Sequence, residues 1–385
     1  MIRLTRAALA ALALLTLTLQ AAIAPRQPAR QSTGKVLAWD SAQDNQPMAV
    51  SNLGQVKAIA QGGSHSLALT TDGKIWAWGN NASGQLGDGS NTNRDVSVQV
   101  ANMANAVAIA AGANYSLALT VEGKVWAWGS NAGGQLGNGN NADSNLPIAV
   151  GDLSHVVSIA TGGGHSLALT ADGKVWAWGD ATFGELGNGT LYGSNVPVSV
   201  SNINGVVAIA AGSNQSLAVT DDGKVWAWGV VGEALSSAEP LRVNNLNDVV
   251  AIAAGTLHNL ALTSDGKVWA WGENYAGQLG TGNLFKSYVP VQVLGVSGVV
   301  AIAAGNLHNL ALTSNGRVWS WGGGANRVGP VLVNNLSGVA SIAAGGDNSR
   351  ALQIQTTAWA WGNNQAGEIG NGGNINSALP VQVQI

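Results

Sequence analysis

The sequence DGKVWAWG occupies residues 172–179 and returns unchanged at 222–229 and 265–272. In KVWAWG the tryptophans alternate with valine and alanine, and a period of two is typical of β-strands. The segment before it, for example SLALT at 116–120, alternates in the same way. An Asp-Gly pair or a near copy joins the two segments, which predicts a β-hairpin.

This hairpin belongs to a longer repeat that begins with Ile-Ala-x-Gly. An apolar strand precedes the hairpin and a P-V-x-V-like strand follows it, so each repeat predicts four strands. Seven such units with almost no helical pattern predict an all-β fold, a seven-bladed β-propeller of four-stranded antiparallel blades. The seven copies of the motif end at Gly62, Gly112, Gly162, Gly212, Gly255, Gly305 and Gly345.

The chain divides into three segments. Residues 1–24 combine Arg3 and Arg6 with an apolar run and then small residues, which is typical of a secretory signal peptide. The apolar run is shorter than the roughly 20 residues of a membrane span, so we expect an exported protein without a span after cleavage. An uncleaved N-terminal anchor is the alternative. Residues 25–33 form a linker, and 34–385 form one propeller domain.

Within this domain, residues 34–50 form a partial leader that contains KVLAWD and PMAV. Seven complete repeats follow, which is enough to close a ring without the leader; the leader then adds to or competes with the outer strands of the last blade. The sequence leaves the role of the leader in ring closure open. The repeats start near residues 55, 105, 155, 205, 248, 298 and 338.

Fourteen of the 15 tryptophans occur as pairs on the predicted third strands. A packing residue recurs in every repeat, whereas a binding aromatic is special to one repeat, so we predict that these pairs form the core between blades. Each indole buries about 150–250 Å². The pairs are Trp76 and Trp78, Trp126 and Trp128, Trp176 and Trp178, Trp226 and Trp228, Trp269 and Trp271, Trp319 and Trp321, and Trp359 and Trp361.

The sequence offers little for catalysis. His65, His165, His258 and His308 share one repeat position, and we expect them to bond backbone near the second strand rather than to hold a metal ion. His155 stands alone and is expected to be solvated. The chain has no cysteine and no nucleophile or metalloprotease motif, so we predict no enzyme activity, cofactor or metal. A net charge of −3 argues against nucleic acid as a partner.

The consensus V-x-x-I-A-A-G-x-x-H-S-L-A-L-T-x-D-G-K-V-W-A-W-G-x-N-x-x-G-Q-L-G-x-G resembles the regulator of chromosome condensation repeat, from about Gly34 to the C-terminus. The resemblance implies a seven-bladed propeller. The founding member is a nucleotide-exchange factor for a small GTPase and uses an inserted wedge. The repeats of this chain depart from their common period only by deletions, so no such insertion is found. A related plant photoreceptor depends on a Gly-Trp-Arg-His-Thr motif that is absent here. A secreted bacterial β-lactamase inhibitor protein of this type implies a binding role for exported bacterial members.

Aromatic residues outside the tryptophan pattern gather in the long loops of repeats three and five. Repeat four reads VVGEALSSAEP there and lacks the G-Q-L-G loop, so we predict a notch over blade four that binds a protein or peptide. The other interpretation is that these rings tuck under their own loops. The predicted walls are Phe183, Leu191, Tyr192, Tyr275, Leu284, Phe285 and Tyr288, with Lys286 and Glu233 at the rim.

The sequence therefore predicts an exported, monomeric, non-enzymatic propeller that binds a protein or peptide through loops on one face. A carbohydrate-binding or cell-envelope-binding module is the alternative, because exposed aromatic rings also stack on sugars. Guanine-nucleotide exchange is the least favoured function.

Overall fold

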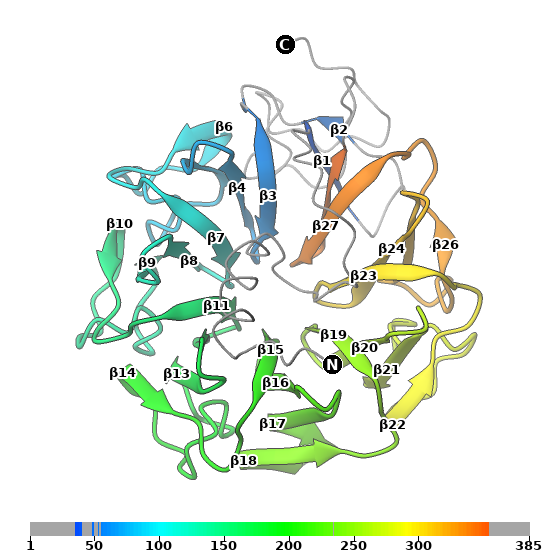
Figure 1. Cartoon of the computed structure of the whole chain (residues 1–385). Coiled ribbons are helices and arrows are strands. Elements are labelled where there is room, and N and C mark those ends of the chain that lie inside the picture. Colours follow the sequence, from blue (N-terminus) through cyan, green and yellow to red (C-terminus); the bar gives the residue numbers. More distant parts are fainter. Residues whose placement is uncertain (1–34, 41–47, 50–52, 54, 234, 354–385) are drawn as a thin grey trace, which may run out of the picture.

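The computed structural model describes residues 35–40, 48–49, 53, 55–233 and 235–353. In this part of the chain every regular element is a β-strand. The strands form seven four-stranded antiparallel sheets around a central axis (Figure 1). The predicted fold class is therefore confirmed. These described residues include no helix long and apolar enough to cross a membrane.

The blades follow the chain, and the first strand of each lies nearest the axis (Figure 1). Blade one contains β3 (Val56–Gln61), β4 (His65–Thr70), β5 (Ile75–Gly79) and β6 (Arg94–Gln99). Blade two contains β7 (Ala106–Ala111), β8 (Tyr115–Thr120), β9 (Val125–Gly129) and β10 (Ser144–Ala149). Blade three contains β11 (Val156–Thr161), β12 (His165–Thr170), β13 (Val175–Gly179) and β14 (Ser194–Ser199).

The next three blades repeat this order. Blade four contains β15 (Val206–Ala211), β16 (Gln215–Thr220), β17 (Val225–Gly232) and β18 (Leu235–Val243). Blade five contains β19 (Val249–Ala254), β20 (His258–Thr263), β21 (Val268–Gly272) and β22 (Ser287–Gln292). Blade six contains β23 (Val299–Ala304), β24 (His308–Thr313), β25 (Val318–Gly322) and β26 (Val331–Leu332).

Blade seven joins segments from opposite ends of the sequence. β27 (Val339–Gly345) and β28 (Asn348–Gln353) come from the seventh repeat, and β1 (Lys35–Asp40) and β2 (Met48–Ala49) come from the leader. The sheet order is β27–β28–β1–β2, so β1 takes the third-strand position. Of the roles that the sequence left open, the described structure shows the leader supplying the two outer strands of the last blade. The predicted pair Trp359 and Trp361 lies outside the described residues.

The hairpin between the second and third strands depends on one glycine. In blade one, Gly73 has φ of 80° and donates its N–H to the Thr70 carbonyl oxygen at 3.0 Å. Glycine adopts this left-handed region without the steric cost that a Cβ brings. Asp72 keeps a negative φ, and its carboxylate accepts a hydrogen bond from the Thr70 hydroxyl at 2.5 Å. This hydrogen bond is the main cause that lowers the pKa of Asp72 to about 2.

The motif residue after the first strand must be glycine because atoms of the next blade and of the same blade lie close to it. A Cβ at Gly62 would lie 2.5 Å from the carbonyl oxygen of Gly112 in the next blade and 2.5 Å from Cε1 of His65. Both distances are shorter than any van der Waals contact, so a side chain would separate the blades at the axis. The repeat therefore carries glycine here because seven inner strands converge on a narrow centre.

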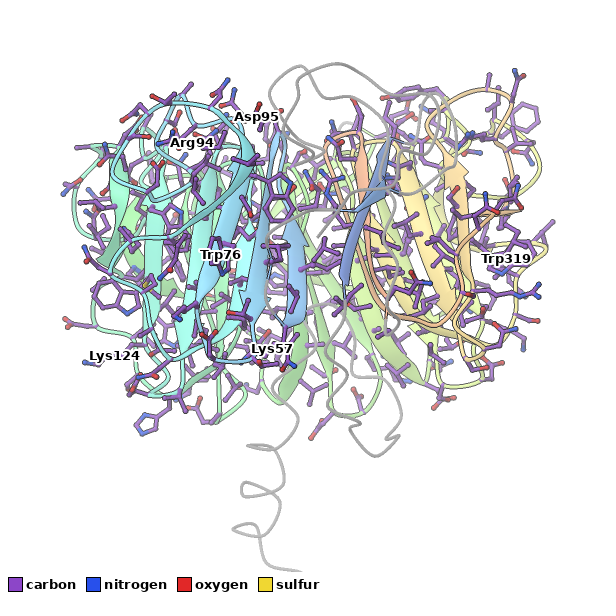
Figure 2. The ribbon with its side chains drawn as sticks, turned by 90° about the horizontal axis from the view of Figure 1, so that it is seen from above. Lys57, Trp76, Arg94, Asp95, Lys124 and Trp319 are labelled. Atoms are coloured by element: carbon purple, nitrogen blue, oxygen red, sulfur yellow. The ribbon has the colours of Figure 1, made fainter. Side chains whose placement is uncertain are left out.

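The tryptophans occupy two environments. The second residue of each described pair is buried, and these residues are Trp78, Trp128, Trp178, Trp228, Trp271 and Trp321. Trp128 of blade two belongs to the same core cluster as Leu67, Leu69 and Ile75 of blade one, so its indole packs between blades. The first residue of each pair is partly buried at the margin of such a cluster, and these residues are Trp76, Trp126, Trp176, Trp226, Trp269 and Trp319. Figure 2 labels Trp76 and Trp319 among them.

Four of the buried indoles, those of Trp128, Trp178, Trp228 and Trp321, also make a hydrogen bond between blades. Nε1 of Trp128 donates to the carbonyl oxygen of Gln85, in the G-Q-L-G loop of blade one, at 2.8 Å. Trp178 makes the equivalent bond to Gln135 at 2.8 Å, and Trp228 to Glu185 at 2.7 Å. A buried indole N–H needs such an acceptor, so the ring and the preceding loop hold each other in place.

The histidines form a second link between blades. His65 Nε2 lies 2.9 Å from Ser116 Oγ on the second strand of blade two, and that hydroxyl donates to the Gln85 carbonyl oxygen at 2.9 Å. The single hydroxyl proton is thereby used, so His65 Nε2 is the donor to Ser116. The equivalent pairs are His165 with Ser216, His258 with Asn309, and His308 with Ser349. The prediction that these histidines bond backbone was wrong, because their rings cross to side chains of the next blade.

Candidate partner-binding surface

The propeller has two ends with different connections. The loops between first and second strands and the long loops between third and fourth strands lie at one end, which we call the loop face. The Asp-Gly hairpins and the connections between blades lie at the other end, the turn face. In Figure 2, Arg94 and Asp95 mark the loop face and Lys57 and Lys124 lie toward the turn face. All nine predicted partner-binding residues belong to the loop-face end of their blades.

In blades one, two and five the long loop is held by one buried asparagine. In blade one, Asn81 Oδ1 accepts the N–H of Leu86 at 2.9 Å, and its Nδ2 donates to the carbonyl oxygens of Ser90 and Thr92 at 3.0 and 3.1 Å. Asn131 and Asn274 hold the loops of blades two and five in the same manner. The side chain thus replaces backbone pairing that an irregular loop lacks.

The loop of blade three departs from this pattern at three positions. Ala181 stands where blades one, two and five have the clamping asparagine, and it is buried. Asp180 and Glu185 replace the amides Asn80 and Gln85, whose side chains bond each other at 2.8 Å in blade one. Glu185 is buried and accepts the N–H of Phe183 at 2.8 Å. Burial raises the pKa of Glu185, and the negative charge of Asp180 adds to this effect.

We expect the substitution Glu185→Gln to raise the free energy of unfolding by about 1 kcal/mol at pH 7. It removes a buried carboxylate and supplies an amide N–H toward Asp180. Because the folded-state pKa of Glu185 is raised, the penalty of its charge grows as the pH rises above the unfolded value. The gain measured by urea unfolding should therefore be larger at pH 7 than at pH 4. The reciprocal change Gln85→Glu is the control and should destabilise; a stability gain that does not vary with pH would contradict this explanation.

The loops of blades three and five expose large apolar side chains. Tyr192 and Phe285 are 82% and 81% exposed, and Leu191 and Tyr275 are 57% and 55% exposed. Phe183 and Leu284 are exposed to a smaller extent. These rings therefore do not tuck fully under their own loops. Because no other described blade carries aromatic residues in its long loop, this exposure is not a consequence of the repeat.

Blade four lies between these loops and carries an extended hairpin instead of a shortened loop. β17 and β18 continue to Gly232 and Leu235, and Leu235 near the tip is exposed. The loop of blade three packs on this hairpin, with the Gly189 N–H donating to the Ala238 carbonyl oxygen at 2.9 Å. From the sequence, the stretch VVGEALSSAEP was interpreted as a shortened loop. In the structure this stretch instead extends the pairing of β17 with β18, and the hairpin fills part of the predicted notch.

Two of the predicted polar residues contact each other. Lys286 of loop five forms an ion pair with Glu233 near the tip of the hairpin. Lys286 Nζ also lies 5.6 Å from the centre of the Tyr288 ring. Tyr288 is only partly exposed and donates its hydroxyl hydrogen bond to the Glu273 carboxylate. Burial, together with Glu273, raises the pKa of Tyr288 to about 12, so the phenol stays protonated and anchors the base of the loop.

The candidate surface is defined here as Phe183, Leu191, Tyr192, Leu235, Tyr275, Leu284 and Phe285. The sequence analysis did not identify Leu235. The available signal was that this apolar residue lies in a hairpin turn and has no position in the core. The charged residues beside this surface are mostly acidic: Asp180, Glu233, Glu239 and Glu273 outnumber the basic residues Lys286 and Arg327. The surface therefore combines exposed aromatic rings with an acidic surround.

The turn face offers a different feature. A groove of about 340 Å³ lies beside the blade-three hairpin and is lined by Asp152, His155 and Trp176 among other residues. His155 is exposed, with φ of 57°. The same groove contains the exposed ion pair between Lys174 and Asp172, which recurs in other hairpins of the repeat. Because the ion pair in this groove recurs in other hairpins, we interpret the groove as a feature of the repeated scaffold.

Comparison with known protein families agrees with this architecture. The RCC1-like domain matches residues 29–234, and the regulator of chromosome condensation repeat matches residues 265–312 and, in a second form, 249–278 and 299–328. The first match alone covers more than half of the chain. This seven-bladed propeller therefore belongs to the RCC1-like domain family.

Curated relatives match over short stretches. The mitochondrial RCC1 domain-containing protein RUG3 of Arabidopsis thaliana is 46% identical over 56 residues, which are 14% of this chain and 13% of the relative. The RCC2 homolog of Xenopus laevis is 48% identical over 44 residues, 11% of this chain and 9% of the relative. The matches thus span about a tenth of each relative, roughly one repeat.

Solved structures resemble the whole propeller. Yeast RCC1 (Prp20), in a structure bound to Kap60, has a TM-score of 0.74 at 22% identity, over 89% of this chain and 96% of the other. Prp20p of Saccharomyces cerevisiae, in work that also describes binding to Gsp1p and histones, has a TM-score of 0.72 at 23% identity, over 90% and 95%. Human WBSCR16 has a TM-score of 0.71 at 22% identity, over 83% and 98%. At these identities the likeness establishes the fold.

Proposed function

We propose that this protein is an exported, non-enzymatic propeller that binds a protein or peptide partner through the loop face of blades three to five. The observation that carries the proposal is the exposure of Tyr192 and Phe285 in two loops whose equivalents in other blades lack aromatic residues. Large aromatic side chains dominate the binding energy of protein interfaces, and exposed apolar side chains that gather in one part of a surface mark interaction sites.

The neighbouring blades supply further support. The hairpin of blade four is bonded to loop three through Gly189 and to loop five through the Lys286–Glu233 pair. A surface held from several sides loses less conformational entropy on binding than independent loops do. The acidic surround of Asp180, Glu233 and Glu273 favours a partner with a basic surface. Structures of similar fold include one protein described with protein partners, Prp20 with Kap60 and with Gsp1p and histones.

Export rests on residues 1–24, whose positive residues, apolar run and small residues match a signal peptide. Outside the cytosol a small GTPase is not an available substrate, so exchange activity is not part of the proposal.

The experiment is a comparison of two surface variants. The chain without residues 1–24 would be immobilised and exposed to secreted and envelope fractions of its own cells, alongside a Tyr192→Ala/Phe285→Ala variant. We expect a protein retained by the parent and lost from this variant. The matched control is Val121→Ala/Leu294→Ala, which removes two exposed apolar side chains from the turn face and should retain the partner.

The outcomes separate the candidate functions. Loss of the protein from the loop-face variant alone supports the proposal, and salt should weaken its binding because the surround is charged. Retention by that variant with loss from the control would place binding on the turn face and overturn the proposal. Retention of glycans instead of a protein would favour the carbohydrate-binding alternative.

A further inference from the structure

Blade six has a buried histidine at each of its two boundaries. His258 of blade five reaches across to blade six, where its Nε2 lies 2.7 Å from Asn309 Oδ1. His308 of blade six reaches across to blade seven, where its Nε2 lies 3.0 Å from Ser349 Oγ. Among the described second strands, no other blade has such a histidine on both sides. At the remaining boundaries the histidine position is taken by Tyr115, Gln215 and Asn348.

The second nitrogen of each ring is enclosed by the protein. A Cβ built on Gly255 would lie 2.6 Å from His258 Nδ1, and one built on Gly305 would lie 2.6 Å from His308 Nδ1. Each Nδ1 therefore faces the motif glycine of its own blade, and neither has a hydrogen-bond partner among the described residues. A proton placed there would be a buried donor without an acceptor, which costs free energy in an apolar interior.

The charges that act on His308 oppose its protonation. After burial, His258 and the guanidinium of Arg327 lower the pKa of His308, to about 3. Burial, opposed only by the Asn309 hydrogen bond, lowers the pKa of His258 to about 4. By contrast, the Asp180 carboxylate acts on His165 of blade three and opposes the effect of burial there. The other charged residues on the loops and strands that pack against the two rings are Glu273, Asp347 and Arg350.

Blade six also lacks the loop that ties blades one, two, three and five to their successors. In blade one, the Gln85 carbonyl oxygen of this loop accepts hydrogen bonds from Ser116 and Trp128 of blade two. Blade six reads GGGANRVGP at 322–330 and has no such glutamine for Ser349. Its outer strand β26 is two residues long, whereas β22 of blade five has six residues. The link through His308 is therefore a larger part of what holds blade six to blade seven.

We propose that blade six is an acid-released part of the propeller, which separates from blades five and seven in mildly acidic solution before the other blades open. The two protons that release it are taken up at opposite boundaries of the same blade, so both favour one local opening step. This inference is independent of the proposed partner-binding function.

The pH dependence of this opening follows from the two rings. A solvated histidine has a pKa of about 6.5, whereas the rings of His258 and His308 titrate at about 4 and about 3 in the closed propeller. Stability is therefore complete above pH 6.5 and is lost as the pH falls. Between pH 7 and pH 5 each ring multiplies the opening constant by about 20, so the two rings together give about 500-fold. A blade with one such ring gives about 20-fold.

The test measures the exposure of a buried thiol in the full chain, which has no cysteine of its own. Ala311→Cys places the thiol on β24 of blade six, and Ala118→Cys places it at the same repeat position on β8 of blade two; both alanines are fully buried. Labelling by a pyridyl disulfide at pH 7 and pH 5 is divided by the rate for the same variant unfolded in guanidinium at that pH. We expect the ratio to rise about 500-fold for Ala311→Cys and about 20-fold for Ala118→Cys.

A pair of variants tests the two rings directly. His258→Gln with His308→Gln supplies the side chain that blade four carries at this position and should remove most of the rise for Ala311→Cys. The matched control, His65→Gln with His165→Gln, should leave that rise unchanged.

Two results would overturn the proposal. Equal rises for Ala311→Cys and Ala118→Cys would show that the whole ring opens in one step; this comparison holds even where a glutamine variant fails to fold. An undiminished rise in a folded His258→Gln/His308→Gln variant would show that other groups take up the protons.

Discussion

Substitution of Trp178 by alanine is expected to lower the free energy of unfolding by about 3–5 kcal/mol. The indole is fully buried and belongs to one core cluster with Leu117 and Val125 of the preceding blade. Its Nε1 donates to the Gln135 carbonyl oxygen at 2.8 Å, and that oxygen would keep only the Ser166 hydroxyl, at 3.0 Å, as a donor. Guanidinium unfolding monitored by circular dichroism would measure the loss.

The matched control is Trp176→Ala on the same strand. Trp176 is only partly buried at the margin of the cluster, so its loss should cost less than half as much. Equal losses for the two substitutions would contradict the assignment of the second tryptophan of each pair as the main contact between blades.

A fall in pH from 7 to 5 is expected to destabilise the propeller by several kcal/mol. His65, His165 and His258 are buried, and burial lowers the pKa of each ring to about 4; the pKa of His308 is lowered to about 3. Nε2 of His65, His165 and His258 donates to the next blade and Nε2 of His308 lies 3.0 Å from Ser349 Oγ, whereas each Nδ1 has no hydrogen-bond partner among the described residues. A proton added at Nδ1 would therefore be a buried donor without an acceptor.

The direction follows from the difference between folded and unfolded rings. The unfolded histidines bind protons near pH 6.5 and the folded ones only near pH 4, so stability is complete above pH 6.5 and falls as the pH drops through this window. At pH 5 each ring costs about 2 kcal/mol. Four rings together approach the whole stability of a typical domain, which is about 5–15 kcal/mol. The hairpin aspartates, with pKa values near 2, lose their contribution only at lower pH.

The control for this prediction is His65→Gln. Glutamine occupies the same repeat position in blade four, where Gln215 Nε2 donates to the Gly255 carbonyl oxygen of the next blade at 3.0 Å. The variant should lose about a quarter of the pH dependence, measured as unfolding midpoints in denaturant between pH 7 and 4.5. A parent protein whose stability is flat over this range would contradict the role assigned to the buried rings.

The repeat made the blades predictable because their determinants are local. The alternation around Trp176 and Trp178 specifies a strand, and Gly173 of the Asp-Gly pair specifies the turn before it. Closure of the ring was not predictable in this way. β1 and the segment at 357–362 carry the same sequence pattern, and that pattern alone does not specify that β1 is the strand that pairs with β28. The partners of the histidines also depend on register between blades, which a period within one repeat does not contain.

The candidate surface was predictable to a similar degree. Tyr192 and Phe285 stood out because they break the repeat, and both are exposed. The pairing of β17 with β18 was not foreseen, since a missing loop motif does not say whether the chain shortens or extends its strands. The substitutions at Ala181 and Glu185 were visible in the sequence, yet their meaning required the amide contacts that Asn81 and Gln85 make in blade one.

The measurement that tests the central claim most directly is site-specific photo-crosslinking in the organism's own cells. A benzophenone amino acid would replace Tyr192, Phe285 or, on the turn face, Val121, which is 65% exposed. We predict that positions 192 and 285 yield the same crosslinked protein and that position 121 does not. Adducts from position 121 alone, or none from either loop, would contradict binding through the loop face of blades three to five.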